Sequence, residues 1–359
     1  MSVFFQPAVF YSAGSSPYGI TAADFNGDGR LDLAITDIGN AEVAVLLGNS
    51  DGTFQAASFF GVGNNPISVT AADFNNDGKM DLAVADSNGG DIAILLGNGD
   101  GTFLPATAVT VGSNPLTVVS ADFNNDGKID LAVTDLGFGN VDVLFGNGDG
   151  TFQAAVPYPV GNLPYGLAAA DLSGDGIVDL VAAVNGDNNV AVLLNNGDGT
   201  FQAAVPYSVG TGPMEIAVAD FNGDGKRDLA VSNFDSQDVA ILLGNGNGTF
   251  QAASFVSIGS NLEGIIAADF DNNGTFDLAV ADNGSNNIAI LTGNGDGTFG
   301  PKQFYAVGSY AAGLVAGDFN NDGRADLAVT NTYSDDVAIL LSDTNSLSRG
   351  APFLNKIER

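Results

Sequence analysis

The feature that most constrains this chain is a unit of 49 residues that occurs seven times without insertion or deletion. The motif Asp-Phe-Asn-Gly-Asp-Gly, or a close variant, begins at Asp24, Asp73, Asp122, Asp171, Asp220, Asp269 and Asp318. A second motif, Gly-Asn-Gly-Asp-Gly-Thr-Phe with small variations, ends at Phe54, Phe103, Phe152, Phe201, Phe250 and Phe299. Self-similarity at a fixed period is the signature of a repeat architecture, so the unit, and not the total length of 359 residues, defines the fold.

Each unit contains four short segments that are β-branched or aromatic in character and are bounded by Gly, Asn or Asp. In the second unit these segments are 67–74, 81–86, 91–97 and 102–111. Helical spacing is absent, and Gly recurs too often for helices to persist. Four antiparallel strands in a unit of this length form a propeller blade. The sequence therefore predicts an all-β fold, a seven-bladed β-propeller of four-stranded antiparallel blades.

The two ends of the repeat region predict how the ring closes. Segment 4–14 aligns with 54–63, the fourth strand of a unit, but has no first three strands of its own. The last unit supplies three strands between 314 and 341, and segment 342–347 lacks the Gly-rich turn. We therefore expect the N-terminal strand to complete the last blade, which covers sheet edges that would otherwise be exposed. The predicted propeller spans 1–342, and 343–359 is a C-terminal tail.

Composition excludes several classes of function. The chain has no Cys and no His, which excludes disulfides, thiolate chemistry, zinc sites and His-based catalysis. It has 10 Lys and Arg against 42 Asp and Glu, a formal charge of −32, so neither nucleic acid nor an anionic membrane is an expected partner. No stretch approaches the roughly 20 apolar residues of a membrane span, so membrane insertion is not expected. The start has no basic n-region, so we expect no signal peptide in this chain.

The loop that begins at Asp24 has the ligand spacing of a calcium loop. Asp24, Asn26 and Asp28 place side-chain oxygens at positions 1, 3 and 5, and Gly at position 6 allows the sharp turn. Arg30 at position 7 can offer only its backbone carbonyl, and the carboxylate of Asp32 at position 9 closes the ligand shell. An EF-hand would place its closing Glu three residues later, on a helix; here the carboxylate starts a strand.

The sequence predicts about seven Ca²⁺ ions, one for each blade. The alternative is that the motif is only a turn sequence, because Asp, Asn and Gly dominate turns. Seven copies, each with a further Asp at position 9, favour calcium, and magnesium demands stricter octahedral geometry. The loops hold 21 of the 42 acidic residues. The predicted metal ligands are Asp24, Asn26, Asp28, Arg30, Asp32, Asp73, Asn75, Asp77, Lys79, Asp81, Asp122, Asn124, Asp126, Lys128, Asp130, Asp171, Ser173, Asp175, Ile177, Asp179, Asp220, Asn222, Asp224, Lys226, Asp228, Asp269, Asp271, Asn273, Thr275, Asp277, Asp318, Asn320, Asp322, Arg324 and Asp326.

The Gly-Asn-Gly-Asp-Gly-Thr-Phe motif has two interpretations, a second metal site or a tight turn. It contains one carboxylate, and Asn247 replaces that Asp in the fifth copy without any other change. Gly and Asn suit the positive φ angles of a turn between the third and fourth strands. The motif is therefore typical of a turn, and we expect its Phe to lie in the core.

These two motifs together resemble the FG-GAP/VCBS repeat family, which includes the integrin α-subunit propeller and many secreted bacterial proteins. The resemblance covers residues 4–342 and implies metal ligands at Asp24, Asn26, Asp28, Arg30 and Asp32 and at their counterparts in each blade. The chain departs from integrins in having a metal motif in all seven units. The resemblance implies a secreted or cell-surface location and a function in cell adhesion, in lectin-like carbohydrate binding, or as an accessory domain of an enzyme.

The two faces of the predicted ring differ in how much the seven copies vary. Strands alternate in direction, so the metal loops and Gly-rich turns share one nearly uniform face. On the other face, five units have a Pro just before the predicted first strand, and the last two units have another residue there. The position that follows it varies as Tyr18, Ile67, Leu116, Tyr165, Met214, Glu263 and Ala312. The loops 37–42, 86–91, 135–140, 184–189, 233–238, 282–287 and 331–336 also differ, and they include Phe138, Phe234 and Tyr333. Such loops either drift freely or form a binding surface for sugar rings or a basic protein segment.

The sequence leaves three functions open. The first is a calcium-binding extracellular propeller that acts as a lectin-like or adhesive ligand-binding module, with a glycan or protein ligand on the variable face. The second is a ligand-free structural scaffold, an amplified or engineered repeat protein. The third is an accessory or catalytic domain of a secreted enzyme. No nucleophile–base pair is visible, so we predict no catalytic residues and no enzyme activity.

Overall fold

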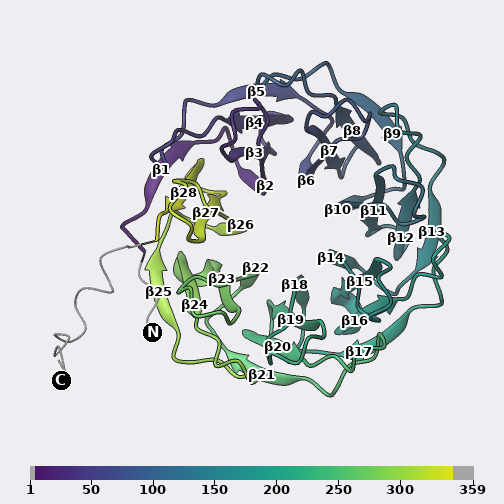
Figure 1. Ribbon diagram of the computed structural model, residues 1–359, viewed down its shortest axis with the longest axis vertical. Helices are drawn as coiled ribbons and strands as arrows, with labels where there is room; N and C mark the ends of the chain where they lie inside the picture. Colours follow the sequence, from purple (N-terminus) through teal and green to yellow (C-terminus); the bar gives the residue numbers. More distant parts are fainter. Residues whose placement is uncertain (1–4, 343–359) are drawn as a thin grey trace, which may run out of the picture.

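The computed structural model describes residues 5–342 and arranges them in seven four-stranded antiparallel sheets around a central axis (Figure 1). This confirms the predicted seven-bladed β-propeller. We number the blades 1 to 7 in the order of their innermost strands along the chain. Residues 1–4 and the predicted tail 343–359 lie outside the described residues.

The seven innermost strands surround the axis. They are β2 (Pro17–Ala23), β6 (Pro66–Ala72), β10 (Pro115–Ala121), β14 (Pro164–Ala170), β18 (Pro213–Ala219), β22 (Leu262–Ala268) and β26 (Ala311–Gly317). The second strands are β3 (Asp32–Asp37), β7 (Asp81–Asp86), β11 (Asp130–Asp135), β15 (Asp179–Val184), β19 (Asp228–Asn233), β23 (Asp277–Asp282) and β27 (Asp326–Asn331).

The third and fourth strands follow outward from the axis. The third strands are β4 (Glu42–Leu46), β8 (Asp91–Leu95), β12 (Asn140–Leu144), β16 (Asn189–Leu193), β20 (Asp238–Leu242), β24 (Asn287–Leu291) and β28 (Asp336–Leu340). The outermost strands are β5 (Ser58–Gly61), β9 (Thr107–Thr110), β13 (Val156–Pro159), β17 (Val205–Ser208), β21 (Ser254–Ser257), β25 (Gln303–Ala306) and β1 (Val9–Ser12). Two short 3-10 helices, Asn185–Asp187 and Asn283–Ser285, lie in loops after β15 and β23.

Burial explains why the strands differ in sequence. The second strand of every blade is buried along its whole length, because neighbouring blades cover both of its faces. Such a strand is a nearly continuous apolar run such as Leu-Ala-Val. The outermost strands are largely exposed. In blade 2 the outermost strand is shorter than the predicted 102–111, because the turn closes on a single bridge between Gly97 and Phe103 and pairing resumes only at Thr107.

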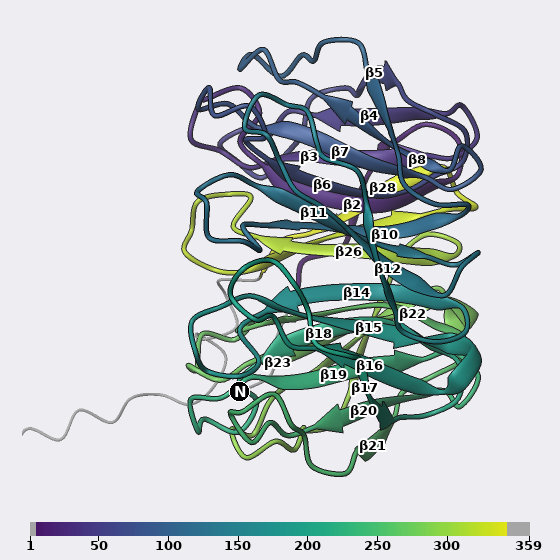
Figure 2. The same ribbon diagram turned by 90° about the vertical axis from the view of Figure 1, so that its right-hand side faces the viewer.

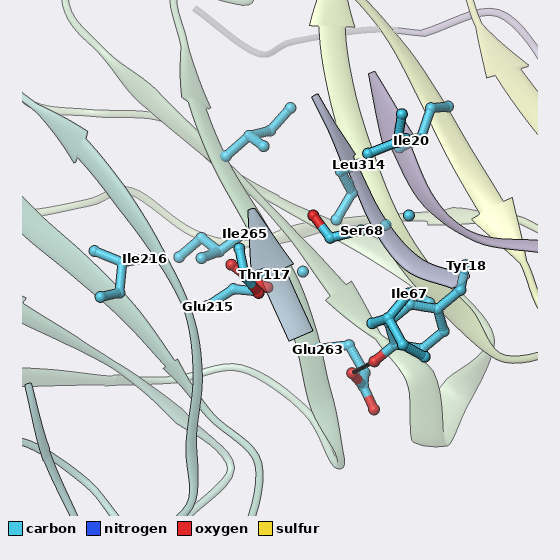
Figure 3. A pocket seen from close by; sticks show the side chains of 16 residues that line it. Tyr18, Ile20, Ile67, Ser68, Thr117, Glu215, Ile216, Glu263, Ile265 and Leu314 are labelled. Atoms are coloured by element: carbon cyan, nitrogen blue, oxygen red, sulfur yellow. Dashed lines mark hydrogen bonds between the residues drawn. The ribbon is translucent and has the colours of Figure 1, made fainter. Parts of the chain in front are cut away.

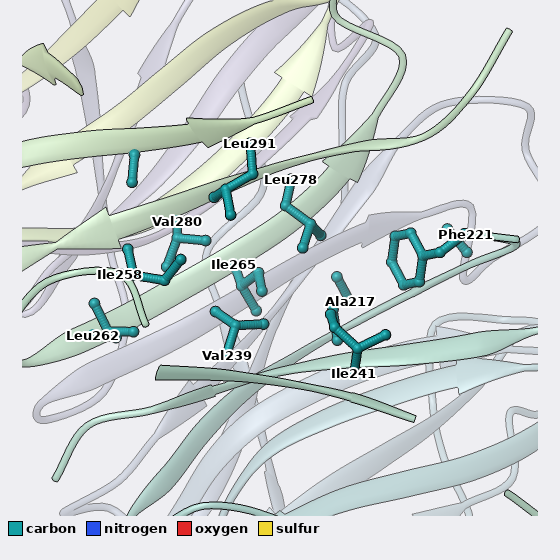
Figure 4. Close-up of a cluster of buried hydrophobic side chains, with 13 residues drawn as sticks. Ala217, Phe221, Val239, Ile241, Ile258, Leu262, Ile265, Leu278, Val280 and Leu291 are labelled. Atoms are coloured by element: carbon teal, nitrogen blue, oxygen red, sulfur yellow. The ribbon is translucent and has the colours of Figure 1, made fainter. Parts of the chain in front are cut away.

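The hydrophobic core is divided into clusters between adjacent blades. Figure 4 shows the cluster between blades 5 and 6, where Phe221 and Ile241 face Ile265 and Leu278. The Phe at position 2 of a metal loop usually packs edge to face on the turn Phe of the next blade. The rings of Phe25 in blade 1 and Phe103 in blade 2, for example, have centroids 5.6 Å apart. The turn Phe side chains are therefore part of the core, as expected.

The ring closes through the N-terminal strand, as predicted. Strand β1 pairs antiparallel with β28, from Val9 opposite Ile339 to Ser12 opposite Asp336. Phe5 forms a further bridge, and its ring meets that of Phe270 at 5.6 Å. Phe5 thus takes the place that a turn Phe takes in the other blades, and it is the counterpart of Phe54. Figure 1 shows β1 on the outer rim beside β28.

The loops gather on two opposite faces of the ring (Figure 2). The metal loops and Gly-rich turns lie on the same face, because the amide of Gly101 in a turn donates to the carbonyl of Phe25 in the metal loop of the preceding blade. We call this the metal-loop face and the opposite one the variable face. Within residues 5–342 there is no helix whose length and hydrophobicity would let it cross a membrane.

Candidate functional site

The metal loops are held in shape by their own position-1 carboxylate. In the first loop, Asp24 accepts hydrogen bonds from the amides of Gly27 at 2.8 Å, Asp28 at 3.2 Å and Gly29 at 2.7 Å. Gly29 has a φ of 80°, which a residue with a Cβ adopts only with strain. These three hydrogen bonds fold the backbone around the Asp24 carboxylate, so that the side-chain oxygens of positions 1, 3 and 5 lie in one tight loop.

In blades 1, 2, 3 and 5 the basic side chain at position 7 contacts the carboxylate at position 5. Lys226 lies 3.1 Å from Asp224 and Lys128 lies 3.4 Å from Asp126, and Arg30 pairs with Asp28. The position-7 amide also donates to the same carboxylate, at 3.0 Å in most loops. These ion pairs are exposed to solvent, so each contributes little to stability. They offset part of the negative charge of the loop, and a metal ion would compete with them for the position-5 oxygen.

The position-9 carboxylates are buried and bonded to backbone. Asp32 has no exposed surface; its two oxygens accept the amides of Phe25 at 2.9 Å and Gly48 at 2.7 Å. Every blade repeats this pair of bonds, which ties the metal loop to the end of the third strand. Burial raises the pKa of Asp32 to about 6, although both backbone bonds act in the opposite direction. Sequence reasoning treated this Asp only as a ligand, whereas the structure also gives it a structural role.

The donor atoms of the loops suit a hard cation, since every candidate side-chain donor is an oxygen. Among the described residues, three carboxylate oxygens lie within 4.8 Å of one another only in blade 6, at Asp269, Asp271 and Asp277. That loop has Asp at position 3 and Thr275 in place of a basic residue at position 7. In blade 4 the position-3 hydroxyl of Ser173 is buried without a hydrogen-bond partner. The metal ligands named from the sequence stay a prediction.

The Gly-rich turns bond to themselves. Asp51 accepts from the amide of Thr53 at 3.1 Å and from its hydroxyl at 2.6 Å, and these bonds lower the pKa of Asp51. Asn247 makes the same two contacts with Thr249, at 3.2 and 2.6 Å. Because the amide replaces the carboxylate without loss of a bond, the turn needs an acceptor there and not a charge.

The aromatic residues predicted on the variable face divide into two groups. Phe138 and Tyr333 are strongly exposed, at 69% and 71%. The ring of Tyr333 packs on that of Tyr310, with centroids 4.5 Å apart. The other predicted residues, Tyr165, Met214 and Phe234, are half-buried. Tyr18, which also follows a loop of this face, instead turns into the centre of the ring.

The centre of the ring contains a cavity of about 260 Å³, lined by the innermost strands. The Tyr18 hydroxyl, from blade 1, donates to Glu263 Oε2 of blade 6 at 3.0 Å (Figure 3). The Tyr310 hydroxyl donates to the other carboxylate oxygen at 3.3 Å. Glu215 of blade 5 lies in the same cavity, and Thr117 bonds to its side chain.

Both glutamates in this cavity are shifted toward the protonated form. Burial raises the pKa of Glu215 to about 7, and the nearby charge of Glu263 adds to that effect. Burial also raises the pKa of Glu263, although its bonds to two tyrosines act in the opposite direction. Loss of water around the charged carboxylates is therefore the main cause in both cases.

Sequence reasoning noted Glu263 but missed Glu215 and Tyr310. The signal for Glu215 was present, since the counterparts of that position in the other units are Gly19, Ser68, Thr117, Gly166, Gly264 and Gly313. A single charged residue among small neutral ones marks a position with a different environment. Tyr310 lies in a loop of no special composition, so nothing in the sequence linked it to Glu263.

Comparison with solved structures identifies other propellers of similar shape. BBS1N, crystallised in complex with ARL6DN, matches with a TM-score of 0.67 and 16% identity over 95% of this chain and 99% of its own. An Agrocybe aegerita lectin that recognises non-reducing terminal N-acetylglucosamine matches with a TM-score of 0.56 and 20% identity over 89% and 86%. Virginiamycin B lyase from Staphylococcus aureus matches with a TM-score of 0.64 and 16% identity over 94% and 99%. At such identities the likeness shows the fold alone.

Comparison with protein-family models gives a match over most of the chain, whereas no curated protein matches it in sequence. The matching model describes an FG-GAP-like repeat. It matches six times, in overlapping stretches at 24–84, 73–133, 122–182, 171–231, 220–280 and 269–329. This confirms the resemblance that the two motifs indicated. The chain therefore belongs to the family of FG-GAP-like repeat proteins.

Proposed function

We propose that this propeller is a calcium-stabilised binding module, secreted or at the cell surface, whose glycan or protein ligand docks on the variable face. The contrast between the two faces carries this proposal. Seven copies of one unit keep the same loops and turns on the metal-loop face, while aromatic and acidic residues diversify the other. Exposed rings such as Phe138 and Tyr333 offer broad contact area on a rigid scaffold.

The calcium part of the proposal is supported by the oxygen donors and by charge. Each loop presents three carboxylates, and the chain has a formal charge of −32. Close carboxylates repel one another unless a cation lies between them. We expect blade 6 to bind first, because Asp269, Asp271 and Asp277 already lie close together and position 7 of that loop holds Thr275 in place of Lys or Arg.

Thermal melting tests the calcium part. A site that binds only the folded state stabilises it by about 2.7 kcal/mol at a free ion concentration a hundredfold above the dissociation constant. Melts in EDTA and in millimolar calcium should therefore differ strongly, with elemental analysis to verify that the EDTA sample is free of metal. Identical curves would remove calcium from the proposal.

A glycan and protein array, probed with and without calcium, tests the binding part. We then expect a double variant, Phe138→Ala with Tyr333→Ala, to lose the ligand and keep its melting temperature. Phe255→Ala is the matched control, because its ring is 54% exposed on β21, away from the variable face. Equal loss of binding in the control would contradict a site on the variable face. A loss of binding on substitution of Lys79 would instead place the ligand on the metal-loop face.

We favour binding over catalysis, although the similar propellers include both binding proteins and a lyase. The aromatic contacts on the variable face suit recognition, and the carboxylates of the loops have their backbone partners. If the array gives no ligand while calcium still raises the melting temperature, the scaffold function stands instead.

A further inference from the structure

We propose that the mouth of the central cavity binds an alkylammonium group, either the end of a lysine side chain or a free aliphatic amine. This inference rests on the proposed function, because it names the ligand chemistry that the variable face would recognise.

The position of the cavity makes it reachable from the variable face. Tyr18 and Glu263 stand at the beginning of β2 and β22, directly after loops of that face, and Tyr310 lies in the loop before β26. Blade 7 has Ala312 at the place where blades 1 and 6 have these larger residues. Ala312 lines the cavity together with Tyr18 and Glu263, and the Tyr18 hydroxyl of blade 1 bonds to Glu263 of blade 6 with blade 7 between them in the ring (Figure 3).

The use of glutamate in this chain is concentrated at the cavity. The described residues contain three glutamates, Glu42, Glu215 and Glu263, whereas aspartate serves the loops and turns. Two of the three lie on adjacent innermost strands, β18 and β22, and line the same cavity. Glutamate extends its carboxylate farther from the backbone than aspartate does. A glutamate on an innermost strand can therefore place its carboxylate inside the cavity, away from the strand.

The charge of these two carboxylates is not balanced by a cation. Among the sixteen lining residues drawn in Figure 3, none is Lys or Arg. Glu263 is 5% exposed, and the two side chains that donate hydrogen bonds to it, Tyr18 and Tyr310, do so through neutral hydroxyls. A buried carboxylate without a counter-charge is costly, so an entering cation gains free energy by removing that cost. A primary ammonium brings one charge and three N–H donors, and it would favour the ionised form of the two carboxyl groups, whose oxygens accept hydrogen bonds.

The walls of the cavity select the rest of the ligand. Ile20, Ile67, Ile265 and Leu314 line the same space as the glutamates. A hydrated divalent ion cannot use such walls, whereas a short alkyl chain loses water by lying against them. The volume of about 260 Å³ is near the lower end for ligand sites, which matches a small amine or one inserted side chain.

The test uses the full chain in millimolar calcium, so that the loops are saturated, and ligand-observed NMR to measure dissociation constants. The probes are butylammonium chloride, 1-butanol as the neutral analogue, and Nα-acetyl-lysine amide. We expect butylammonium to bind at least tenfold more tightly than 1-butanol. A lysine source predicts that Nα-acetyl-lysine amide binds at least as well as butylammonium, and a free-amine source predicts the reverse order.

Charge removal gives the second arm of the test. Glu215→Gln and Glu263→Gln should each weaken butylammonium binding about tenfold, and Glu42→Gln, on β4 at the same face, is the matched control and should leave it unchanged. If Glu263→Gln fails to fold, Glu215→Gln alone carries the test. Equal binding of butylammonium and 1-butanol would overturn the proposal, and so would unchanged binding in both variants.

Two further outcomes separate this proposal from the function on which it rests. If the glutamine variants lower the calcium stoichiometry instead of amine binding, the cavity is a metal site and the proposal is wrong. If the amine does not bind while an array ligand still depends on Phe138 and Tyr333, the ligand-binding function stands and only the assignment of the cavity falls.

Discussion

Replacement of a position-9 aspartate should destabilise the propeller even when no calcium is present. Asp130 in blade 3 has no exposed surface, and its two oxygens accept the amides of Phe123 at 2.9 Å and Gly146 at 2.8 Å. Asp130→Ala leaves both of these buried amides without a partner. The metal loop then loses its link to the turn that follows β12.

The size of the effect follows from the two hydrogen bonds. A bond to a charged group contributes about 1.5–3 kcal/mol, and a buried donor left unpaired costs about 1–3 kcal/mol. The carboxylate itself is costly to bury, since burial raises the pKa of Asp130 to about 6, and this offsets part of the gain. We therefore expect a loss of about 3 kcal/mol in the free energy of unfolding. At about 2–4 °C per kcal/mol for a large domain, the melting temperature should fall by roughly 6–12 °C.

The assay is a thermal melt of wild type, Asp130→Ala and Asp126→Asn in EDTA and in calcium. Asp126 is the matched control, because it is an exposed position-5 carboxylate of the same loop. In EDTA we expect only Asp130→Ala to melt early, whereas in calcium both variants should lose part of the stabilisation by the ion. If Asp130→Ala and wild type melt together in EDTA, the carboxylate acts only through metal and the structural argument is refuted.

Three further predictions test the closure, the turns and a buried charge. Phe5→Ala should cost about 3–5 kcal/mol by removing a buried ring, and deletion of residues 1–14 should cost more, whereas Phe10→Ala, with a ring 49% exposed on the same segment, should change the melting temperature little. Asp51→Asn should leave both calcium stoichiometry by calorimetry and melting temperature unchanged, since Asn247 makes the same bonds; equal loss for Asp51→Asn and Asp24→Asn would contradict this. Asp142→Ala should stabilise the protein by on the order of 2 kcal/mol at pH 7, because burial raises the pKa of Asp142 to about 6. The folded state holds the proton on Asp142 more tightly than the unfolded state does, so wild-type stability falls as the pH rises from about 4 to about 6. The free energies of unfolding of the two proteins, measured in urea, should therefore diverge as the pH rises through that window and not below it.

The fold could be predicted from the sequence because the repeat supplied independent evidence seven times. A single unit would leave strand boundaries uncertain, but the fixed period placed the first three strands of the second unit within about two residues of their observed ends and began only the outermost strand too early. The closure followed from one missing turn and one surplus strand. The period also identifies the residue that fills the last turn position: Phe5 lies 49 residues before Phe54, and its ring packs on that of Phe270.

The metal loops show where motif reasoning is incomplete. The spacing of Asp24, Asn26 and Asp28 identifies a loop that presents oxygens, and the structure keeps that arrangement. The motif does not reveal that Asp32 bonds to Gly48, because that residue belongs to a different part of the unit. A carboxylate that serves as a ligand and one that bonds to backbone have the same sequence signature.

The central cavity was harder to predict because its residues come from different blades. Tyr18 and Glu263 are 245 positions apart and come from blades that are not neighbours in the ring. No local pattern encodes such a contact. Comparison of equivalent positions could nevertheless have identified Glu215, which is a charged residue where six other copies have small neutral ones.

The sevenfold repeat offers its own measure of what the ring requires. A position that holds the same residue type in every blade serves the ring, as the position-9 aspartates do through their backbone bonds. The ring does not require glutamate at the sites of Glu215 and Glu263, because other blades close without it. Glu263 is buried and Glu215 half-buried, and the raised pKa of each means that its charged form works against folded stability at neutral pH. Two such costs in one cavity, next to apolar walls and without a cation, are what a site for a positively charged ligand requires.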